Sequence, residues 1–380
     1  MMLRCPVFEF AVDWRISVEF DTAIETICDY TNYGNRLQNY ALRSILLKYG
    51  HCANIRMLLG VSSKWEYMIY EVRSVVQIIL SMMPLGNRSL KYRRFAKSLQ
   101  ITSKYMPDGD FILLRQDLIQ KNNNTFEKLI IGSDQVWNYQ WLSKQELELR
   151  LGSFISDSHS IISYAASFGV SEIDDDVKPI FQKYLPRFKA ISVREDRGAE
   201  LVKEMTGLDA TVVLDPTLML PANKWLEITE NFVPDDDRYI LTYFLGRPSD
   251  EQERDIQAYA KTHDCHVRRI LDLRDKETYV AGPQDFVELF SKAQYIFTDS
   301  YHACCFSILF HKQFTVFNRV GMIGKSNMNS RMETLFRLFD FDSMVMDSGL
   351  APEIDYTRVD WLLEQHRRES QNWLDKAMEN

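Results

Sequence analysis

Short apolar runs alternate with segments of helical periodicity along most of the chain. Strands are expected over residues 23–28, 128–131, 160–165, 190–193, 211–214, 239–244, 266–270, 295–298 and 313–317. Between them, apolar residues recur every three or four positions, as where Leu37, Ala41 and Ile45 share one helical face. This alternation of strands and helices predicts an α/β architecture with parallel sheets.

Two prolines interrupt the pattern near residue 218. Pro216 and Pro221 can continue neither a helix nor a central strand, and a length of 380 residues predicts two or three domains. We expect Rossmann-like domains over residues 1–218 and 219–355, with an amphipathic helix over 356–380 that returns to the first domain. Parallel sheets bind ligands at the carboxyl ends of their strands, so two of them would face an interdomain cleft.

Composition and charge exclude several classes of protein. Hydrophobic residues make up 46% of the chain, and 45 basic against 53 acidic residues give a net charge of −8. An acidic chain of this kind is not built to bind nucleic acid. The six cysteines form no CxxC pair, so neither a disulfide framework nor a metal site is expected. Free thiols and the absence of a signal-like N-terminus predict a cytoplasmic protein.

A basic segment stands out against this acidic background. Residues 86–104 contain six Lys or Arg and no acid, and they follow the apolar run 75–85. The basic residues are Arg88, Lys91, Arg93, Arg94, Lys97 and Lys104. This pairing suggests a patch over 75–104 that rests on an anionic membrane surface. A solvated helix face is the alternative interpretation.

The candidate chemistry lies where strands end. Gly34 lets backbone N–H groups approach an anion at a helix start, although a tight turn is the alternative. Arg194 follows a β-branched strand and is able to hold a carboxylate or phosphate, or to pair with Glu195. His302 opens an almost wholly apolar helix, a position that favours acid–base catalysis. Other polar groups follow strands at 132–134, 163–169, 215–216 and 299–301.

Several blocks together resemble a known family. They are YGNRLQNYAL (33–42), IIGSDQVWN (130–138), SYAASFG (163–169), ISVREDRGAELVKEMTG (191–207), VVLDPTLML (212–220), YILTYFLG (239–246) and FTDSYHACCFSILFHKQFTVF (297–317). In this order they resemble the polysaccharide pyruvyl transferases of bacterial capsule and exopolysaccharide pathways. The resemblance implies a GT-B-like fold of two Rossmann-like domains. It also implies transfer of a pyruvyl unit from phosphoenolpyruvate to two hydroxyls of a sugar, giving a pyruvate ketal, with no cofactor and no metal.

The same resemblance implies roles for particular residues. It places Arg194 and His302 in donor binding and catalysis. Ser300, Tyr301 and His302 are expected to bind the donor. One branch of the family has Arg-Leu-His at these three positions, so another cation must help to hold the donor here. Arg331 is the first candidate and Arg36 the second.

The acceptor side is inferred from the remaining strand-end residues. Asp134 and Glu195 are candidates to activate an acceptor hydroxyl. Further acceptor-binding candidates are Gly34, Asn35, Arg36, Gln38 and Asn39. Trp137 and Tyr164 are candidates to stack on a sugar ring, with core packing as the alternative.

The resemblance also implies partners. The acceptor is expected to be a lipid-linked saccharide, such as one carried on a polyprenyl diphosphate, at the cytoplasmic face of the inner membrane. The segment 75–104 would suit such a peripheral location. A nucleotide-sugar glycosyltransferase of the same fold is the main alternative function, and a non-catalytic assembly partner is the second.

Overall fold

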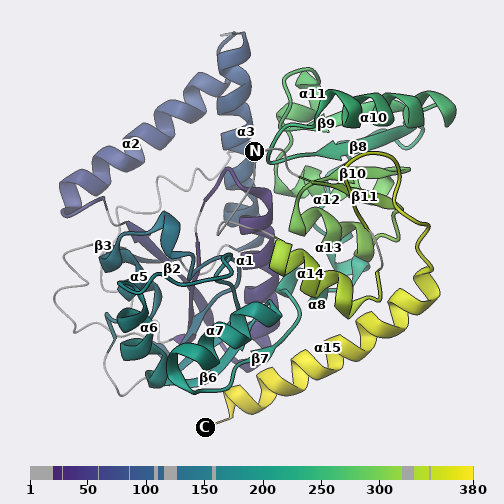
Figure 1. Ribbon diagram of the computed structural model, residues 1–380. Helices are drawn as coiled ribbons and strands as arrows, with labels where there is room; N and C mark the ends of the chain where they lie inside the picture. The colour runs from purple at the N-terminus through teal and green to yellow at the C-terminus, as the bar shows by residue number, and fades with distance from the viewer. Residues whose placement is uncertain are drawn as a thin grey trace.

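Two parallel β-sheets, each flanked by helices, make up the protein (Figure 1). The computed structural model describes residues 20–27, 29–58, 60–84, 86–106, 110–114, 126–155, 160–318, 329–341 and 344–379. The first sheet has the strand order β3-β2-β1-β4-β5-β6-β7, and the second has the order β12-β11-β10-β8-β9. The predicted α/β class, with two sheets of parallel strands, is confirmed.

The strands of the first sheet are β1 (Phe20–Glu25), β2 (Cys52–Leu58), β3 (Asp110–Leu114), β4 (Phe126–Ile131), β5 (Ser160–Ala166), β6 (Phe188–Val193) and β7 (Thr211–Val212). Those of the second sheet are β8 (Tyr239–Tyr243), β9 (His266–Ile270), β10 (Ile296–Thr298), β11 (Phe314–Phe317) and β12 (Val345–Met346). Three of these strands, β2, β3 and β12, were not predicted. For the expected strand over 23–28, Cys28 lies outside the described residues.

The helices of the first half are α1 (Tyr33–Leu46), α2 (Lys64–Ser81), α3 (Asn87–Tyr105), α5 (Lys144–Arg150), α6 (Lys178–Tyr184) and α7 (Asp196–Thr206). The others are α8 (Pro216–Met219), α9 (Ala222–Leu226), α10 (Asp250–Thr262), α11 (Lys276–Tyr279), α12 (Pro283–Lys292), α13 (Tyr301–Leu309), α14 (Asn329–Leu338) and α15 (Tyr356–Met378). Local chemistry defines their ends: Ser249 and Gln252 form a capping box that starts α10. Across the described residues, no helix has both the length and the apolar character of a membrane span.

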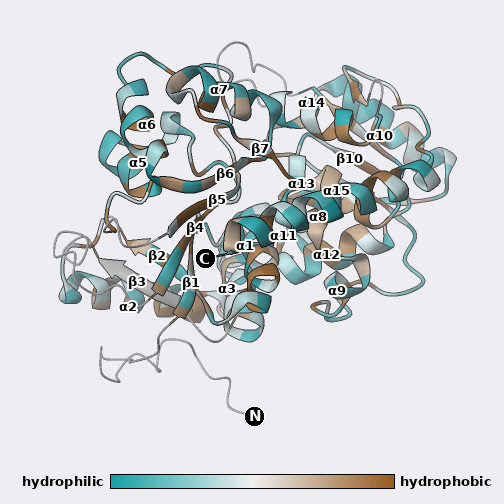
Figure 2. Ribbon diagram, turned by 90° about the horizontal axis from the view of Figure 1, so that it is seen from below, coloured by the Kyte–Doolittle hydropathy of each residue, from teal (hydrophilic) through white to brown (hydrophobic). Residues whose placement is uncertain are grey.

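Strand β4 shows how the first sheet is buried on both faces. Leu129 and Ile131 pack into one core cluster together with Trp137. Ile130, between them, points to the opposite face and packs with Leu42 of α1. Successive side chains of a strand point to opposite faces, and a parallel sheet covered by helices is apolar on both. Figure 2 shows this layering, with the brown strand β5 inside helices that carry teal surfaces.

Helix α1 joins the two halves. Its residues Tyr33 and Leu37 belong to the same core cluster as Phe286 of α12. The ring of Tyr33 stacks on Phe286 at a centroid distance of 5.2 Å, and its hydroxyl donates to the carbonyl of Ala281 at 2.8 Å. The first turn of α1 is therefore held firmly at the junction between the sheets.

The C-terminal helix α15 (yellow in Figure 1) runs from the second half back to the first, as predicted. Leu362 and Leu363 pack into the core of the second half, whereas Leu374 and Met378 pack with residues of β1 and α1. Arg367 donates to the carbonyl of Leu218 at 2.7 Å, which ties the middle of the helix to the chain between the two sheets.

Candidate active site at the junction of the two sheets

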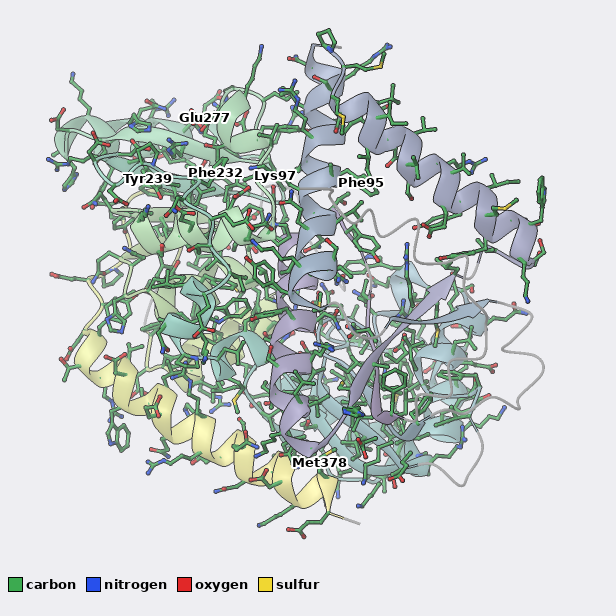
Figure 3. All side chains as sticks on the ribbon, turned by 180° about the vertical axis from the view of Figure 1, so that it is seen from behind. Phe95, Lys97, Phe232, Tyr239, Glu277 and Met378 are labelled. Carbon is green, nitrogen blue, oxygen red and sulfur yellow. The ribbon has the colours of Figure 1, made fainter. Side chains whose placement is uncertain are left out.

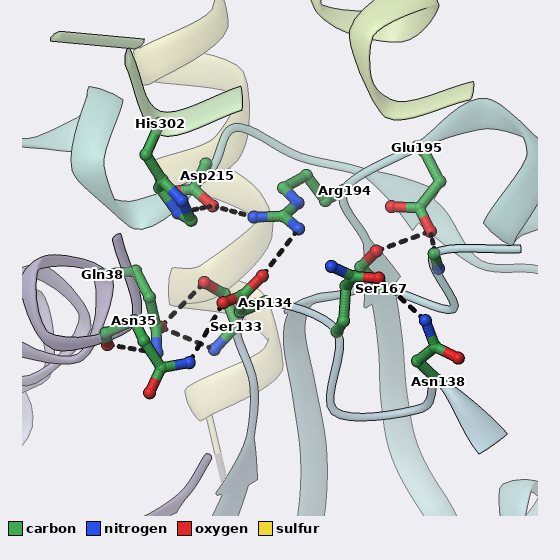
Figure 4. A network of polar contacts seen from close by, with 12 residues as sticks. Asn35, Gln38, Ser133, Asp134, Asn138, Ser167, Arg194, Glu195, Asp215 and His302 are labelled. Carbon is green, nitrogen blue, oxygen red and sulfur yellow. Dashed lines mark hydrogen bonds and ion pairs between the residues drawn. The ribbon is translucent and has the colours of Figure 1, made fainter. Parts of the chain in front are cut away.

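The ends of strands and the starts of helices bring a set of charged side chains together at the junction (Figure 4). Arg194 follows β6 and precedes α7, while His302 and Arg331 lie in the first turns of α13 and α14. Asp134 follows β4. Helix N-termini carry partial positive charge and attract anions. The starts of α7, α13 and α14 therefore add positive potential at the junction.

Arg194 is the centre of this network. Its Nη1 donates to Asp215 Oδ2 at 2.7 Å, and its Nη2 donates to Asp134 Oδ1 at 3.0 Å. The ring of Tyr301 covers the guanidinium at 4.3 Å. Burial works against the charge of Arg194, but the two carboxylates outweigh it and raise its pKa. Arg194 is thus a permanent cation whose terminal nitrogens are already engaged.

Asp215 connects Arg194 to His302. Its Oδ1 accepts from the backbone N–H and the hydroxyl of Thr217 at 2.9 and 2.7 Å. Its Oδ2 lies 3.7 Å from Nε2 of His302. Burial alone would raise the pKa of Asp215, but His302 and Arg194 lower it well below its usual value. Asp215 therefore presents a fixed negative charge to the imidazole of His302.

Asp134 links this network to α1. Its Oδ2 accepts from Asn35 Nδ2 at 3.1 Å, and Asn35 Oδ1 in turn accepts from the N–H of Asp29 at 2.9 Å. Burial opposes the charge of Asp134, but Arg194, His302 and Arg331 together lower its pKa. Asp134 is therefore a weak base whose two oxygens already accept from cationic and amide donors.

Arg331 is a buried cation with a different environment. It is 2% exposed, and among the described residues it makes no ion pair with a carboxylate. With its amide oxygen turned toward Arg331, Gln135 accepts from both terminal nitrogens at 3.1 and 3.3 Å. Burial and the neighbouring charge of Arg194 lower the pKa of Arg331 to about 10. A buried cation that forms no ion pair with any described carboxylate is suited to an incoming carboxylate or phosphate.

Glu195 is the carboxylate with an unused oxygen. Its Oε1 accepts from the hydroxyl of Ser167 and the N–H of Phe168, both at 2.9 Å. Its Oε2 is buried without a hydrogen-bond partner among the described residues, and burial raises its pKa. Glu195 is therefore suited to hold a proton. Among the described residues, no group of three or more His, Cys, Asp or Glu side chains is arranged to hold a metal ion.

Gly34 allows the two halves to approach at His302. A Cβ atom at residue 34 would lie 2.1 Å from Nδ1 of His302, so only glycine fits there. This contact sets the start of α1 against the start of α13. His302 itself is 7% exposed, so the site is nearly closed in this structure.

The profile of the polysaccharide pyruvyl transferase family matches residues 32–319. The chain belongs to this family. No curated protein matches the sequence significantly. The matched range contains every residue of the network except Arg331, which lies beyond it.

The chain also resembles several solved structures, at low sequence identity. UDP-GlcNAc 2-epimerase from Neisseria meningitidis, bound to UDP-GlcNAc, is 11% identical with a TM-score of 0.41, over 93% of this chain and 99% of that one. MnaA from S. aureus, in a co-structure with UDP, is 12% identical with a TM-score of 0.43, over 92% and 95%. The H444N variant of the wall teichoic acid polymerase TagF is 12% identical with a TM-score of 0.44, over 95% and 83%.

The side chains of the acceptor-binding candidates on α1 do not lie together at one place. Asn35 joins the network through Asp134. Gln38 positions the residue before Asp134, because its Oε1 accepts from the N–H and hydroxyl of Ser133 at 3.1 and 2.9 Å. Asn39 and Arg36 point elsewhere, and Asn39 Nδ2 donates to Asn54 at 2.9 Å.

Arg36 lies in a separate environment from Arg194. Its Nη2 donates to the hydroxyl of Thr102 on α3 at 2.6 Å, and its guanidinium lies 4.8 Å from the ring of Tyr30. Arg331 is the candidate cation whose charge acts on Asp134 and Glu195. Of the two candidates, the structure thus brings Arg331, and not Arg36, into the network.

The interpretation of Trp137 and Tyr164 as sugar-stacking residues is wrong. Both are 0% exposed. Trp137 packs against Phe168 at a centroid distance of 5.2 Å, and Tyr164 packs against Trp373 of α15 at 6.3 Å. Position at a strand end does not decide which way a side chain points, and here the alternative of core packing holds.

Sequence reasoning did not name Asp215 as a site residue. The available signal was an acid between a strand and Pro216, which also fits its observed role as N-cap of α8. Asp299 accepts from the N–H groups of Leu245 and Gly246 at 2.7 and 2.8 Å. Ser300 is the N-cap residue of α13, but its side chain makes no capping bond.

Proposed function

We propose that the protein transfers a pyruvyl unit from phosphoenolpyruvate to two hydroxyls of a saccharide, closing a pyruvate ketal. Membership of the polysaccharide pyruvyl transferase family supports the transfer. The observation that carries the choice of donor is the buried cation Arg331, which forms no ion pair with a carboxylate among the described residues and whose charge acts on Asp134 and Glu195. Phosphoenolpyruvate carries both a carboxylate and a phosphate, so it would supply the missing negative charge.

The reaction needs a proton at the donor methylene and a path for the proton of each acceptor hydroxyl. Protonation of the methylene lets the first hydroxyl attack C2, phosphate then leaves, and the second hydroxyl attacks the same carbon. One of the two hydroxyl protons makes up for the proton that was added to the methylene, and the other leaves with phosphate. His302, held by the fixed charge of Asp215, is the proposed proton carrier. Glu195, whose burial raises its pKa, is the second proton-holding group.

Arg194 has a supporting role in this scheme. Its terminal nitrogens are engaged by Asp134 and Asp215, so it fixes the carboxylates that surround His302. Arg331 then makes the direct contact with the donor. A preorganised cation in a closed site stabilises the charge that moves from the enol to the phosphate.

The first test is thermal denaturation with phosphoenolpyruvate. At 100 times its dissociation constant, a ligand adds about 2.7 kcal/mol to the stability of the folded protein. We expect this shift for the wild type and its loss in Arg331→Gln. We expect His302→Gln to keep the shift but to stop saccharide-dependent phosphate release. The product should be the saccharide enlarged by one pyruvate less one water.

The opposite pattern would reject the proposal. A thermal shift with UDP-sugars and none with phosphoenolpyruvate would indicate a nucleotide-sugar glycosyltransferase. An undiminished thermal shift with phosphoenolpyruvate in Arg331→Gln would show that the donor does not bind at Arg331.

A further inference from the structure

Helix α2 exposes a continuous apolar stripe. Its members are Trp65, Met68, Ile69, Val72, Val76, Ile79 and, just after the helix, Met83, and each is more than a third exposed. At 3.6 residues per turn, these positions lie within about 60° of a single line along the helix. Contiguous exposed apolar surface of this kind marks an interaction site.

The opposite side of α2 is more polar than the exposed side. Tyr67 and Ser81 are the buried residues of this helix, and Tyr70 and Ser74 share their side. A helix of a water-soluble domain normally turns its apolar stripe toward the core. In α2 the polarity is reversed, so the core of this protein does not account for the stripe.

Helices α2 and α3 pack against each other as a helical hairpin. Helix α3 anchors this hairpin to the second half of the protein (Figure 3). Lys97 pairs with Asp285 at 2.6 Å and lies 4.3 Å from the ring of Phe232. Lys104 pairs with Glu230. In Figure 1, α2 stands away from both sheets, at the outer side of α3. The body of the protein thus holds the hairpin but leaves the stripe uncovered.

The hairpin is basic although the chain is acidic. Residues 61–106 contain eight Lys or Arg and two Glu, a net charge of +6, against −8 for the whole chain. Arg73, Arg88 and Lys91 are exposed and form no ion pair with any described residue. Arg88 and Lys91 line one surface hollow together with Leu273. The hairpin therefore carries exposed cationic side chains that are available to an anionic partner.

We propose that α2 docks in the plane of an anionic lipid bilayer. The stripe would enter the boundary between headgroups and acyl chains, and Arg73, Arg88 and Lys91 would meet the phosphate headgroups. A second copy of this chain is a less suitable occupant, because dimerisation through α2 would bring two hairpins of charge +6 together. The proposal does not depend on the identity of the donor at the active site.

Flotation of the full chain with vesicles tests the proposal. We expect the wild type to bind vesicles of phosphatidylcholine with phosphatidylglycerol, and to bind phosphatidylcholine alone much more weakly. Val72→Glu with Ile79→Glu should weaken binding by about tenfold or more, because two charges enter the stripe. Replacement of Arg73, Arg88 and Lys91 by Gln should weaken binding to the anionic vesicles by about fivefold per residue.

A matched control is available outside the hairpin. Leu350 and Trp361 are 48% and 55% exposed, close to the 55% and 53% of Val72 and Ile79. Leu350→Glu with Trp361→Glu should leave vesicle binding unchanged, and circular dichroism should show that all variants are folded. Absence of binding to anionic vesicles, or equal binding by the stripe, charge and control variants, would overturn the proposal. A wild-type dimer that fails to bind vesicles and becomes monomeric in Val72→Glu with Ile79→Glu would identify a second copy as the occupant.

Discussion

Replacement of Arg194 by methionine tests the central ion network most directly. The Arg194 side chain is fully buried between Asp134 and Asp215. Methionine keeps most of the volume but removes the charge, so two buried carboxylates lose their common partner. Breaking a buried ion pair from one side costs about 3–5 kcal/mol. The unfolding entropy is about 2.1 cal/mol/K per residue. For a chain of 380 residues, this loss of unfolding free energy lowers the midpoint of thermal unfolding by about 4–6 °C.

The cost should depend on pH in a defined direction. In the wild type the pKa values of both carboxyls are lowered, so their contribution to stability is complete above about pH 4 and is lost only in stronger acid. Without Arg194, His302, Arg331 and local hydrogen bonds still oppose the effect of burial, but both pKa values rise above those in the wild type, so the carboxyls take up protons at a higher pH. Each pH unit below the new pKa recovers about 1.4 kcal/mol per protonated group. The stability gap between Arg194→Met and wild type should therefore narrow as the pH falls from neutral toward about 4.

Urea unfolding of both proteins across this pH range measures the gap. Arg197 provides a matched control, because it also contacts two carboxylates, Glu200 and Glu204, but on the exposed surface. Arg197→Met should cost less than about 1 kcal/mol, without the same pH dependence. A gap for Arg194→Met that stays constant with pH, or a cost no larger than that of Arg197→Met, would refute the reasoning.

Three further predictions concern single positions. Gly34→Ala should destabilise the protein by about 1–3 kcal/mol and reduce turnover, because the new methyl group displaces the His302 ring; unchanged kinetics and an unchanged melting temperature would contradict this. Arg331→Met should leave stability equal or higher in the absence of ligand, since burial already lowers the pKa of Arg331; a large loss in urea unfolding would point to a structural role. Trp137→Ala should cost about 3–5 kcal/mol, whereas Trp141→Ala, at a residue 62% exposed, should cost little.

Much of the fold was predictable because apolar runs mark buried strands. The strand over His266–Ile270 has the predicted ends, and the C-terminal helix begins at the predicted residue, Tyr356. Strand β2 was not predicted because Asn54 and Arg56 interrupt its apolar residues. Strand β12 has only two residues, so its pairing with β11 depends on tertiary context rather than on any local pattern.

The site was predictable in location but not in detail. The carboxyl ends of parallel strands meet at one edge of a sheet, which explains why Asp134 and Arg194 are neighbours in space. The partner of each residue depends on distances that the sequence does not contain. Arg194 was expected to face the donor, yet its terminal nitrogens are taken by Asp134 and Asp215. Trp137 was a candidate to stack on a sugar, with core packing as the alternative, and it fills the core.

The placement of α1 has a consequence for how the molecule unfolds. Tyr33 and Leu37 follow the first strand in sequence but are buried among side chains of the second half, and α15 crosses the junction a second time. Separating the halves would expose an apolar face on each of them. The two sheets should therefore melt in one cooperative transition, and a fragment that carries only one sheet should aggregate when it is expressed alone.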